Sequence, residues 1–196
     1  MGTHDSVFMR KSLRHLDALR NVGRQDSGTG VPFPEGWFDL PESTLTDLGA
    51  MALLTSLNRA HANLTMPQVM AQIEVPLRLK QYRIFRSGGY PRAFVTWAGL
   101  SDGAERRFAL QHRPLKPQDW NSGTSTWVVD FVAPFGHVAD VLSKLQSVQT
   151  PRVRTLWHNK TGTRYRIMEW SREKPGQDIS VRSFGVGQFA KHLGGE

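Results

Sequence analysis

The stretch WVVDFVAPFG, residues 127–136, has the composition of a buried β-strand that ends before Pro134 and Gly136. Asp130 lies in the middle of this apolar run. A carboxylate in such surroundings costs several kcal/mol unless it is paired or solvated. Asp130 is therefore expected to face a cleft, or to orient a cation or an imidazole. The alternative is that strand alternation points its side chain into plain solvent.

The patterns around this strand alternate between helical and strand spacing. A helix is predicted over 137–148, where apolar residues recur at helical spacing, and a strand over 164–170. Upstream, runs at 82–85 and 93–97 flank the turn signal Ser87–Pro91 and predict a hairpin. Further helices are expected from an N-cap at Ser43, Thr44 or Thr46 to Leu57, over 66–73 before Pro76, and over 103–111. This order predicts an α+β fold in which helices pack on a sheet.

The two ends of the chain differ in composition from this central part. Residues 5–22 have the spacing of an amphipathic helix, and residues 31–41 combine three prolines with large aromatic side chains. We expect 1–44 to be an N-terminal extension. Residues 174–196 are rich in Gly and Ser, weakly patterned, and expected to form a tail. A single domain is predicted over 45–173.

The composition limits where in the cell the protein is expected and which functional groups it can use. The 196 residues contain no cysteine, which excludes disulfides, a thiol nucleophile and a thiolate metal site. No run of about 18 apolar residues is present, so no transmembrane segment is predicted. The N-terminus lacks the basic-then-apolar pattern of a secretory signal. These features favour a cytoplasmic location.

The formal net charge of +8 belongs to the central part of the chain. Residues 78–116 and 152–174 are strongly basic, whereas residues 1–46 are nearly balanced. A basic surface favours an acidic partner such as nucleic acid, anionic lipid or an acidic carrier protein. The alternative is a solvated face that only keeps the protein soluble. Aromatic residues interleaved with the basic ones, Tyr82, Phe85, Tyr90 and Trp97, fall at strand positions and are expected in the core, which disfavours nucleic acid.

The candidate catalytic or metal-binding residues include histidines and serines. His61 follows the second predicted helix, at a point where a rigid element holds a side chain beside irregular structure. No metal site is predicted, because His61, Asp130 and His137 fit no ligand spacing and His112 and His158 are unclustered. No serine lies in a G-x-S-x-G context, so a hydrolase nucleophile elbow is disfavoured.

One loop near the C-terminus favours a different donor. Arg182-Ser183-Phe184-Gly185-Val186-Gly187 resembles the R/Q-x-x-G-x-G loop with which coenzyme A acetyltransferases hold a pyrophosphate. Little chain follows it for a helix and the strands that normally come after such a loop. An acyl-CoA-dependent N-acyltransferase acting on another amine is therefore an alternative function. A non-catalytic basic module that binds RNA or a partner protein is a second alternative.

Several motifs resemble those of the RTX toxin-activating lysine acyltransferases. The matching pieces are Gln81-Tyr82, Tyr90-Pro91-x-Ala93, Thr96-Trp97-Ala98-x-Leu100-Ser101, Asp119-Trp120-Asn121-Ser122-Gly123 and Trp127-x-x-Asp130-x-x-Ala133-Pro134-Phe135-Gly136. Order and spacing both agree with the family. The last two pieces are specific, because an acidic residue inside an apolar strand before Ala-Pro-Phe-Gly is uncommon. The resemblance covers about residues 48–172.

The resemblance implies a fold, a site and partners. The fold is expected to be like the GCN5-related acetyltransferases, a twisted mixed sheet with flanking helices. His61 and Asp130 fall on the family's essential pair. No tightly bound cofactor is expected; acyl carrier protein would bring the fatty acyl thioester to internal lysines of an RTX protoxin, and a homodimer is possible. Around His61 this chain departs from the family, with Asn58, Ala62 and Leu64 where serine, arginine and tryptophan are usual.

The expected chemistry is acyl transfer to an amine. A free lysine has a pKa of about 10.4 and needs a base, which a histidine with a pKa near 6.5 supplies. His61 is expected to take the proton while Asp130 orients the imidazole and stabilises its charged form. The acyl carrier is acidic, so basic residues of the central part are candidates for steering it: Arg78, Lys80, Arg83, Arg86, Arg106 and Arg107.

Overall fold

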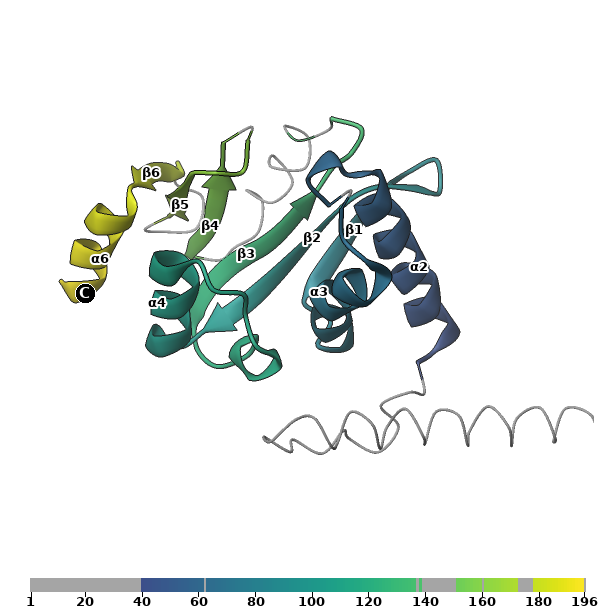
Figure 1. Cartoon of the computed structure of the whole chain (residues 1–196), viewed down its shortest axis with the longest axis horizontal. Helices are drawn as coiled ribbons and strands as arrows, with labels where there is room; N and C mark the ends of the chain where they lie inside the picture. Colours follow the sequence, from purple (N-terminus) through teal and green to yellow (C-terminus); the bar gives the residue numbers. More distant parts are fainter. Residues whose placement is uncertain are drawn as a thin grey trace, which may run out of the picture. The chain divides into compact units, whose positions relative to one another are not determined.

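The computed structural model describes residues 40–61, 63–136, 138, 151–159, 161–172 and 178–195 (Figure 1). The predicted helix 5–22 and extended segment 31–41 fall almost wholly outside these residues, as does the predicted helix 137–148. Element labels follow Figure 1. The predicted boundaries of the extension, domain and tail stay predictions.

The core of the fold is one six-stranded sheet whose strands lie in chain order. Neighbouring strands are antiparallel except β3 and β4, which run parallel. The predicted α+β class is thus confirmed as a mixed sheet with packed helices. The strands are β1 (Tyr82–Ser87), β2 (Tyr90–Leu100), β3 (Ser125–Val132), β4 (Arg152–His158), β5 (Tyr165–Ser171) and β6 (Ser180–Phe184).

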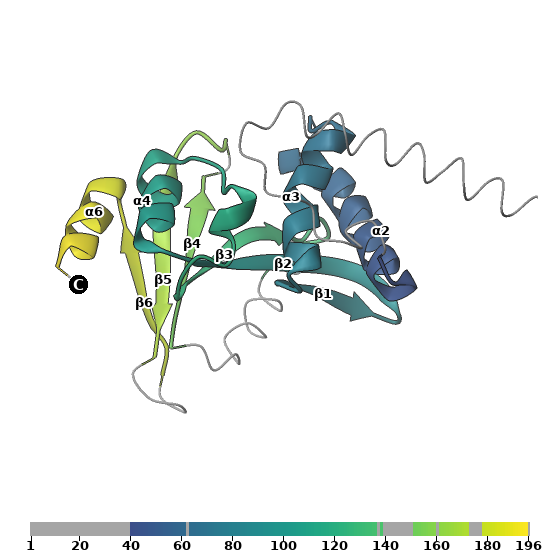
Figure 2. The same cartoon turned by 90° about the horizontal axis from the view of Figure 1, so that it is seen from below.

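Helices cover one face of this sheet. Figure 2 shows α2, α3 and α4 on the same side, and α6 beside α4. Their starts follow local chemistry: Gln68 accepts the Thr65 N–H at the start of α3, and Ser101 accepts the Ala104 N–H at the start of α4. The helical elements are α2 (Glu42–Leu57), the 3-10 turn η1 (Arg59–His61), α3 (Met66–Arg78), α4 (Asp102–Gln111), the 3-10 turn η2 (Pro117–Asp119) and α6 (Val186–Gly194). Among the described residues, no helix is long and apolar enough to cross a membrane.

Aromatic side chains join the helices to the sheet. Trp127 on β3 is fully buried and packs edge-on against Phe108 of α4 and Phe189 of α6, with ring centroids 5.4 and 5.9 Å apart. Such edge-to-face pairs add to the free energy of apolar burial. The Trp127 indole N–H also donates to Glu105 at 2.7 Å, so its polar atom is satisfied inside the core. This cluster holds α4 and α6 on the sheet beside β3.

The other side of this core is ionic. Arg154 on β4 is 1% exposed and donates to Glu105 at 2.6 Å and to Glu169 at 2.7 Å. Both carboxylates are buried as well. A buried charge needs partners of this kind, since an unpaired ion in the interior is strongly destabilising. Arg154, Glu105 and Glu169 therefore bind β4, β5 and α4 together.

The Asp119–Gly123 motif forms a loop that is hydrogen-bonded to the end of β2. Gly99 and Gly123 approach so closely that a Cβ on Gly123 would lie 2.5 Å from the Leu100 carbonyl oxygen. The N–H groups of Ser122 and Gly123 both donate to the Gly99 carbonyl, at 2.8 and 3.0 Å. Only glycine allows such backbone proximity. The motif thus has a structural role in ordering the chain before β3.

Most of the predicted elements that fall on described residues are confirmed, with three differences. Helix α3 was expected to end before Pro76 but continues to Arg78, because a proline in the last turn interrupts little of the hydrogen-bond ladder. Strand β4 was not predicted, since its basic residues hide its apolar positions. The expected tail contains β6 and α6, anchored by the fully buried Phe189, so the weak pattern there was misleading.

Candidate active site

His61 is positioned by the turn that ends α2. Asn58 leaves the helix with extended dihedral angles, and its side-chain oxygen accepts the Ala60 N–H at 3.0 Å. The His61 N–H then donates to the Asn58 carbonyl at 2.9 Å, closing the 3-10 turn η1. Asn58 therefore shapes the turn that presents His61.

Asp130 is positioned by a β-bulge in β3. Asp130 pairs with Thr96 and Val128 pairs with Trp97, so Val129 has no partner on β2. Cross-strand partners share a face, and the bulge therefore puts Asp130 on the face that also buries Trp127. Three residues apart on a regular strand, the two side chains would point to opposite faces. The bulge thus turns the carboxylate toward the helix-covered face.

The two predicted catalytic side chains meet. His61 Nε2 lies 3.9 Å from Asp130 Oδ1, and the side chains are 16% and 23% exposed. This separation is an ion-pair distance rather than a hydrogen bond. Burial raises the pKa of the Asp130 carboxyl, and the His61 imidazole partly opposes that rise. The expectation that Asp130 faces a cleft with an imidazole is consistent with this geometry.

Both side chains line a pocket of about 1250 Å³. The register pairs β3 with β4 only at Trp127–Arg154 and Val128–Thr155, after which the strands separate toward their carboxyl ends (Figure 1). Residues from both strands beyond that point line the pocket, including Asp130 and Phe131 on one side and Leu156 and Trp157 on the other. The pocket therefore opens where two neighbouring strands stop pairing.

The two ring nitrogens of His61 have different surroundings. Its Nε2 faces Asp130, whereas its Nδ1 is shielded from solvent and has no hydrogen-bond partner among the described residues. A buried polar atom without a partner costs free energy and marks a place where a water or substrate group belongs. The imidazole therefore has one nitrogen at Asp130 and one that no described group pairs.

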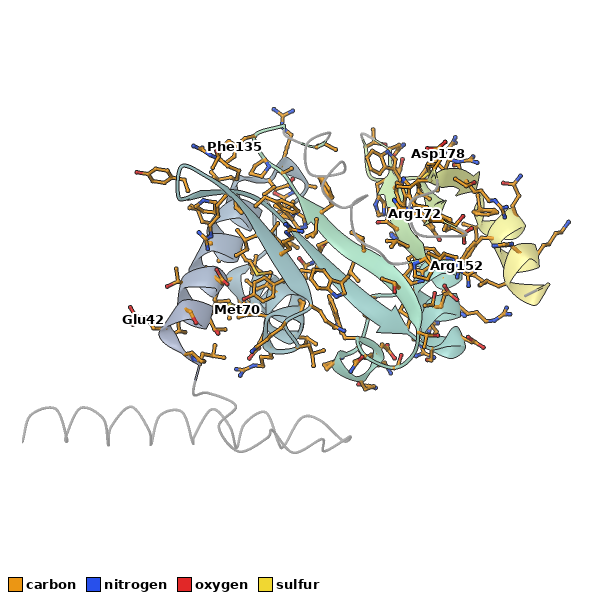
Figure 3. The ribbon with its side chains drawn as sticks, turned by 180° about the vertical axis from the view of Figure 1, so that it is seen from behind. Glu42, Met70, Phe135, Arg152, Arg172 and Asp178 are labelled. Atoms are coloured by element: carbon orange, nitrogen blue, oxygen red, sulfur yellow. The ribbon has the colours of Figure 1, made fainter. Side chains whose placement is uncertain are left out.

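The pocket wall combines aromatic and cationic side chains. Trp97, Trp157 and Trp170 line it, and Trp157 is 47% exposed. Arg59, Arg83 and Arg172 also line it. In Figure 3, Arg172 lies on the β4–β5 side of the sheet and Phe135 lies beyond the end of β3. The pocket thus has an apolar wall with cationic side chains around it.

The basic residues proposed to steer the carrier do not form one group. Arg83 lines the pocket. Arg78 pairs with Glu74 and Arg86 pairs with Asp47, at 2.8 and 2.7 Å. The α4 members are tied elsewhere, since Arg107 pairs with Asp119 and Arg106 donates to the Leu193 carbonyl. Of the six residues, Arg83 is therefore the one that the described structure places at the pocket, together with Arg59 and Arg172.

The glycine loop over Arg182–Gly187 lies apart from this pocket. Its first three residues end β6, and its last two begin the nine-residue helix α6. The side chain of Gln188 accepts the Gly185 N–H at 2.8 Å, which occupies a donor that a pyrophosphate would need. No residue of the loop is among those described as lining the pocket with His61. The structure thus gives the loop no link to the His61–Asp130 pair.

The remaining histidines include one pair that the sequence prediction missed. His112 and His158 were expected to be unclustered, but their Nε2 atoms lie 3.0 Å apart and both rings contact Tyr165. The α4 helix ends at His112 and β4 ends at His158, so only the fold brings them together. Among the described residues, no group of three or more His, Cys, Asp or Glu side chains could hold a metal ion.

The fold and the site thus define a class of protein: a two-layer α+β protein with a histidine–carboxylate pair in an aromatic pocket. Comparison with known families identifies the family within that class. The profile of the RTX toxin acyltransferase family matches residues 41–171, and the chain belongs to that family. The match includes His61, Asp130 and every other pocket residue named above except Arg172.

Named relatives agree with this family. An RTX-II toxin-activating lysine-acyltransferase (ApxIIC) of Actinobacillus pleuropneumoniae is 33% identical over 89 residues, 45% of this chain and 56% of the relative. A leukotoxin-activating lysine-acyltransferase (LtxC) of Aggregatibacter actinomycetemcomitans is 33% identical over 90 residues, 46% and 54% of the two chains. A protein-lysine myristoyltransferase (HlyC) of Escherichia coli is 30% identical over 89 residues, 45% and 51%. The matched segments thus span about half the length of these relatives.

Proposed function

We propose that this protein is a protein-lysine fatty acyltransferase that moves an acyl chain from acyl carrier protein to internal lysines of an RTX protoxin. The observation that carries the proposal is the meeting of His61 and Asp130, 3.9 Å apart, in the wall of a pocket of about 1250 Å³. The relatives named as lysine acyltransferases support the reaction type.

The base would be His61. An ammonium cannot attack a thioester, and a lysine with a pKa of about 10.4 is almost wholly protonated at neutral pH. The ammonium first loses one proton to solvent, and His61 would take a second proton from the nitrogen as the neutral amine forms its bond to the thioester carbonyl carbon. Asp130, at ion-pair distance, would stabilise the imidazolium that results. Contacts of this kind often tighten only when substrate is bound.

The reaction then balances without a further group. The C–N bond forms, the C–S bond breaks, and the thiolate of the carrier leaves. The proton held by His61 passes to that thiolate, which restores the neutral imidazole. The products are an amide on the lysine and a free thiol on the carrier, and no metal is required for either step.

The separated strands suit a thioester arm. Beyond Val128 and Thr155 the strands β3 and β4 no longer pair with each other, and residues of both strands line the pocket. Amide groups of an extended arm would pair with such edges, and an N–H there would stabilise the oxyanion of the intermediate. The tryptophans of the wall would bury the acyl chain, at about 0.8 kcal/mol for each CH₂ removed from water. We propose on the same grounds that the fold is of the GCN5-related acetyltransferase kind.

The test is co-expression with an RTX protoxin, followed by mass spectrometry of its lysines. The wild-type chain should yield acyl-lysine, whereas His61→Ala and Asp130→Asn should lower the yield by about 100-fold or more. His112→Ala and Asp102→Asn are matched controls, because neither residue lines the pocket with His61. Thermal melting of every variant separates loss of chemistry from loss of fold. Full acylation by His61→Ala would contradict the proposal.

A second arm of that experiment identifies the donor. Purified acyl carrier protein and coenzyme A, each loaded with the same acyl chain, would be supplied in turn. We expect transfer from the carrier protein, weakened by salt if Arg59, Arg83 and Arg172 steer it. Transfer from coenzyme A alone would favour the acyl-CoA alternative, and binding without transfer from either would favour a non-catalytic module.

A further inference from the structure

A buried hydroxyl lies directly behind the catalytic carboxylate. Thr96 on β2 is 0% exposed, and its Oγ1 accepts the main-chain N–H of Asp130 at 3.1 Å. This contact is made at the bulge, where the register between β2 and β3 shifts. At the bulge the Asp130 N–H therefore has a side-chain acceptor on the neighbouring strand.

The hydroxyl matters to the bulge because Thr96 is fully buried, so the acceptor of the Asp130 N–H lies in the interior of the protein. A donor left unpaired inside a protein is costly, so a strand without the hydroxyl would be expected to rearrange toward regular pairing. Regular pairing would shift the strand by one residue and move the Asp130 side chain to the other face. The carboxylate would then no longer lie 3.9 Å from His61 Nε2.

We propose that Thr96 is a positioning residue for acyl transfer, whose buried hydroxyl holds the β3 bulge that points Asp130 at His61. The proposal rests on the proposed function, since it assigns Asp130 its part in catalysis. Thr96 touches neither the pocket nor His61 in the described contacts, and it acts through the Asp130 main chain.

The chain offers a matched control at a second buried threonine. Thr55 of α2 is 1% exposed, and its Oγ1 donates to the Met51 carbonyl at 2.8 Å. Replacing either threonine by valine removes one buried hydroxyl while keeping the shape of the side chain. Thr55→Val removes a donor that only duplicates the helix hydrogen bonds, whereas Thr96→Val removes the acceptor of the Asp130 N–H.

The experiment measures acyl transfer by the full chain with a series at residue 96. For Thr96→Val we expect kcat to fall by roughly 10- to 100-fold, as when a reacting group is misplaced by about 1 Å. KM for the acyl carrier should stay unchanged, and the pH profile of kcat should approach that of Asp130→Asn. Thr96→Ser should restore most of kcat, and Thr96→Cys, a weaker acceptor, should be intermediate. Thr55→Val should leave kcat and the pH profile unchanged.

The outcomes separate this inference from the proposed function. Equal kcat for valine, cysteine and serine at residue 96, in variants that melt as folded proteins, would overturn the positioning role. A drop in kcat of the same size in Thr55→Val would overturn it too, because any buried hydroxyl would then serve. Should Thr96→Val not fold, the comparison of serine with cysteine still decides. Retained activity in Asp130→Asn would instead remove the proposed function on which the inference rests.

Discussion

Strands β2 and β3 bury apolar side chains such as Phe94, Val95 and Trp127, whereas β4 and β5 place Arg154 and Glu169 at equally buried positions. The first region shows the apolar periodicity from which sequence patterns are recognised. The second is held by paired charges, which a pattern of apolar residues does not reveal. The pocket lies between the two regions, but Leu156, Trp157 and Trp170 form its wall on β4 and β5, and the paired charges Arg154 and Glu169 do not line it.

Removing the cation of the ionic region should have the largest effect on stability. Arg154→Met leaves Glu105 and Glu169 buried without their guanidinium, and we expect unfolding free energy to fall by about 3–5 kcal/mol. Urea denaturation followed by circular dichroism measures this. Arg164→Met, at an exposed position near the start of β5, is the control and should change stability by less than about 0.5 kcal/mol. If both variants changed the unfolding free energy by the same small amount, the buried charges would not stabilise this region.

The apolar anchor of α6 should come next. Phe189→Ala removes a fully buried ring that packs on Trp127 and should cost about 3 kcal/mol. Phe135→Ala, at a ring that is 48% exposed, is the control and should cost far less. Differential scanning calorimetry compares the two. If both variants melted like the wild type, α6 would not be part of the cooperative fold.

Substitutions at two glycines test whether each of two loops has a structural role or a ligand-binding role. Gly123→Ala would put a Cβ 2.5 Å from the Leu100 carbonyl oxygen and should cost about 1–3 kcal/mol. Gly187→Ala meets nothing within 4 Å and should leave both stability and acyl transfer nearly unchanged. Thermal melting and the lysine acylation assay check the pair. Loss of transfer in a well-folded Gly187→Ala protein would revive the acyl-CoA alternative for Arg182–Gly187.

The smallest expected effect is on the pH dependence of stability, through the pair His112 and His158. Burial, and secondarily the charge of His112, lower the pKa of His158 below its ordinary value of 6.5. The unfolded chain therefore takes up this proton first as pH falls through about 6.5, and stability falls in that window. Melting temperatures from pH 8 to pH 5 should show a shallower decline for His158→Ala than for the wild type. An identical decline would contradict this assignment.

The same contrast explains what could be predicted from the sequence. The helix before His61, the hairpin and the strand with Asp130 follow from apolar periodicity and turn residues. Strand β4 was missed because Arg152 and Arg154 break its pattern, and the latter is buried only because β5 and α4 supply carboxylates. The α6 helix was missed because Phe189 is its one fully buried residue.

The site was predictable in part for a similar reason. His61 and Asp130 were identified by resemblance, and their 3.9 Å separation accords with that assignment. Thr96 was inside a recognised motif, but nothing in its chemistry marks a threonine on a strand as a bulge partner. The His112–His158 pair depends on two elements ending side by side, which no local pattern encodes. Arg106 and Arg107 were proposed from charge alone, and the fold ties them away from the pocket.

The unpaired Val129 gives the spacing between Trp127 and Asp130 a meaning of its own. In a homologue that lacked this one residue, the tryptophan and the aspartate would stand two apart on a regular strand, which puts both side chains on the same face without a bulge. Such a protein would keep the orientation of the carboxylate, but it would not need a side-chain acceptor for the main-chain N–H of the aspartate. The length of the interval between the two residues therefore indicates in which members of the family a threonine on the neighbouring strand has this task.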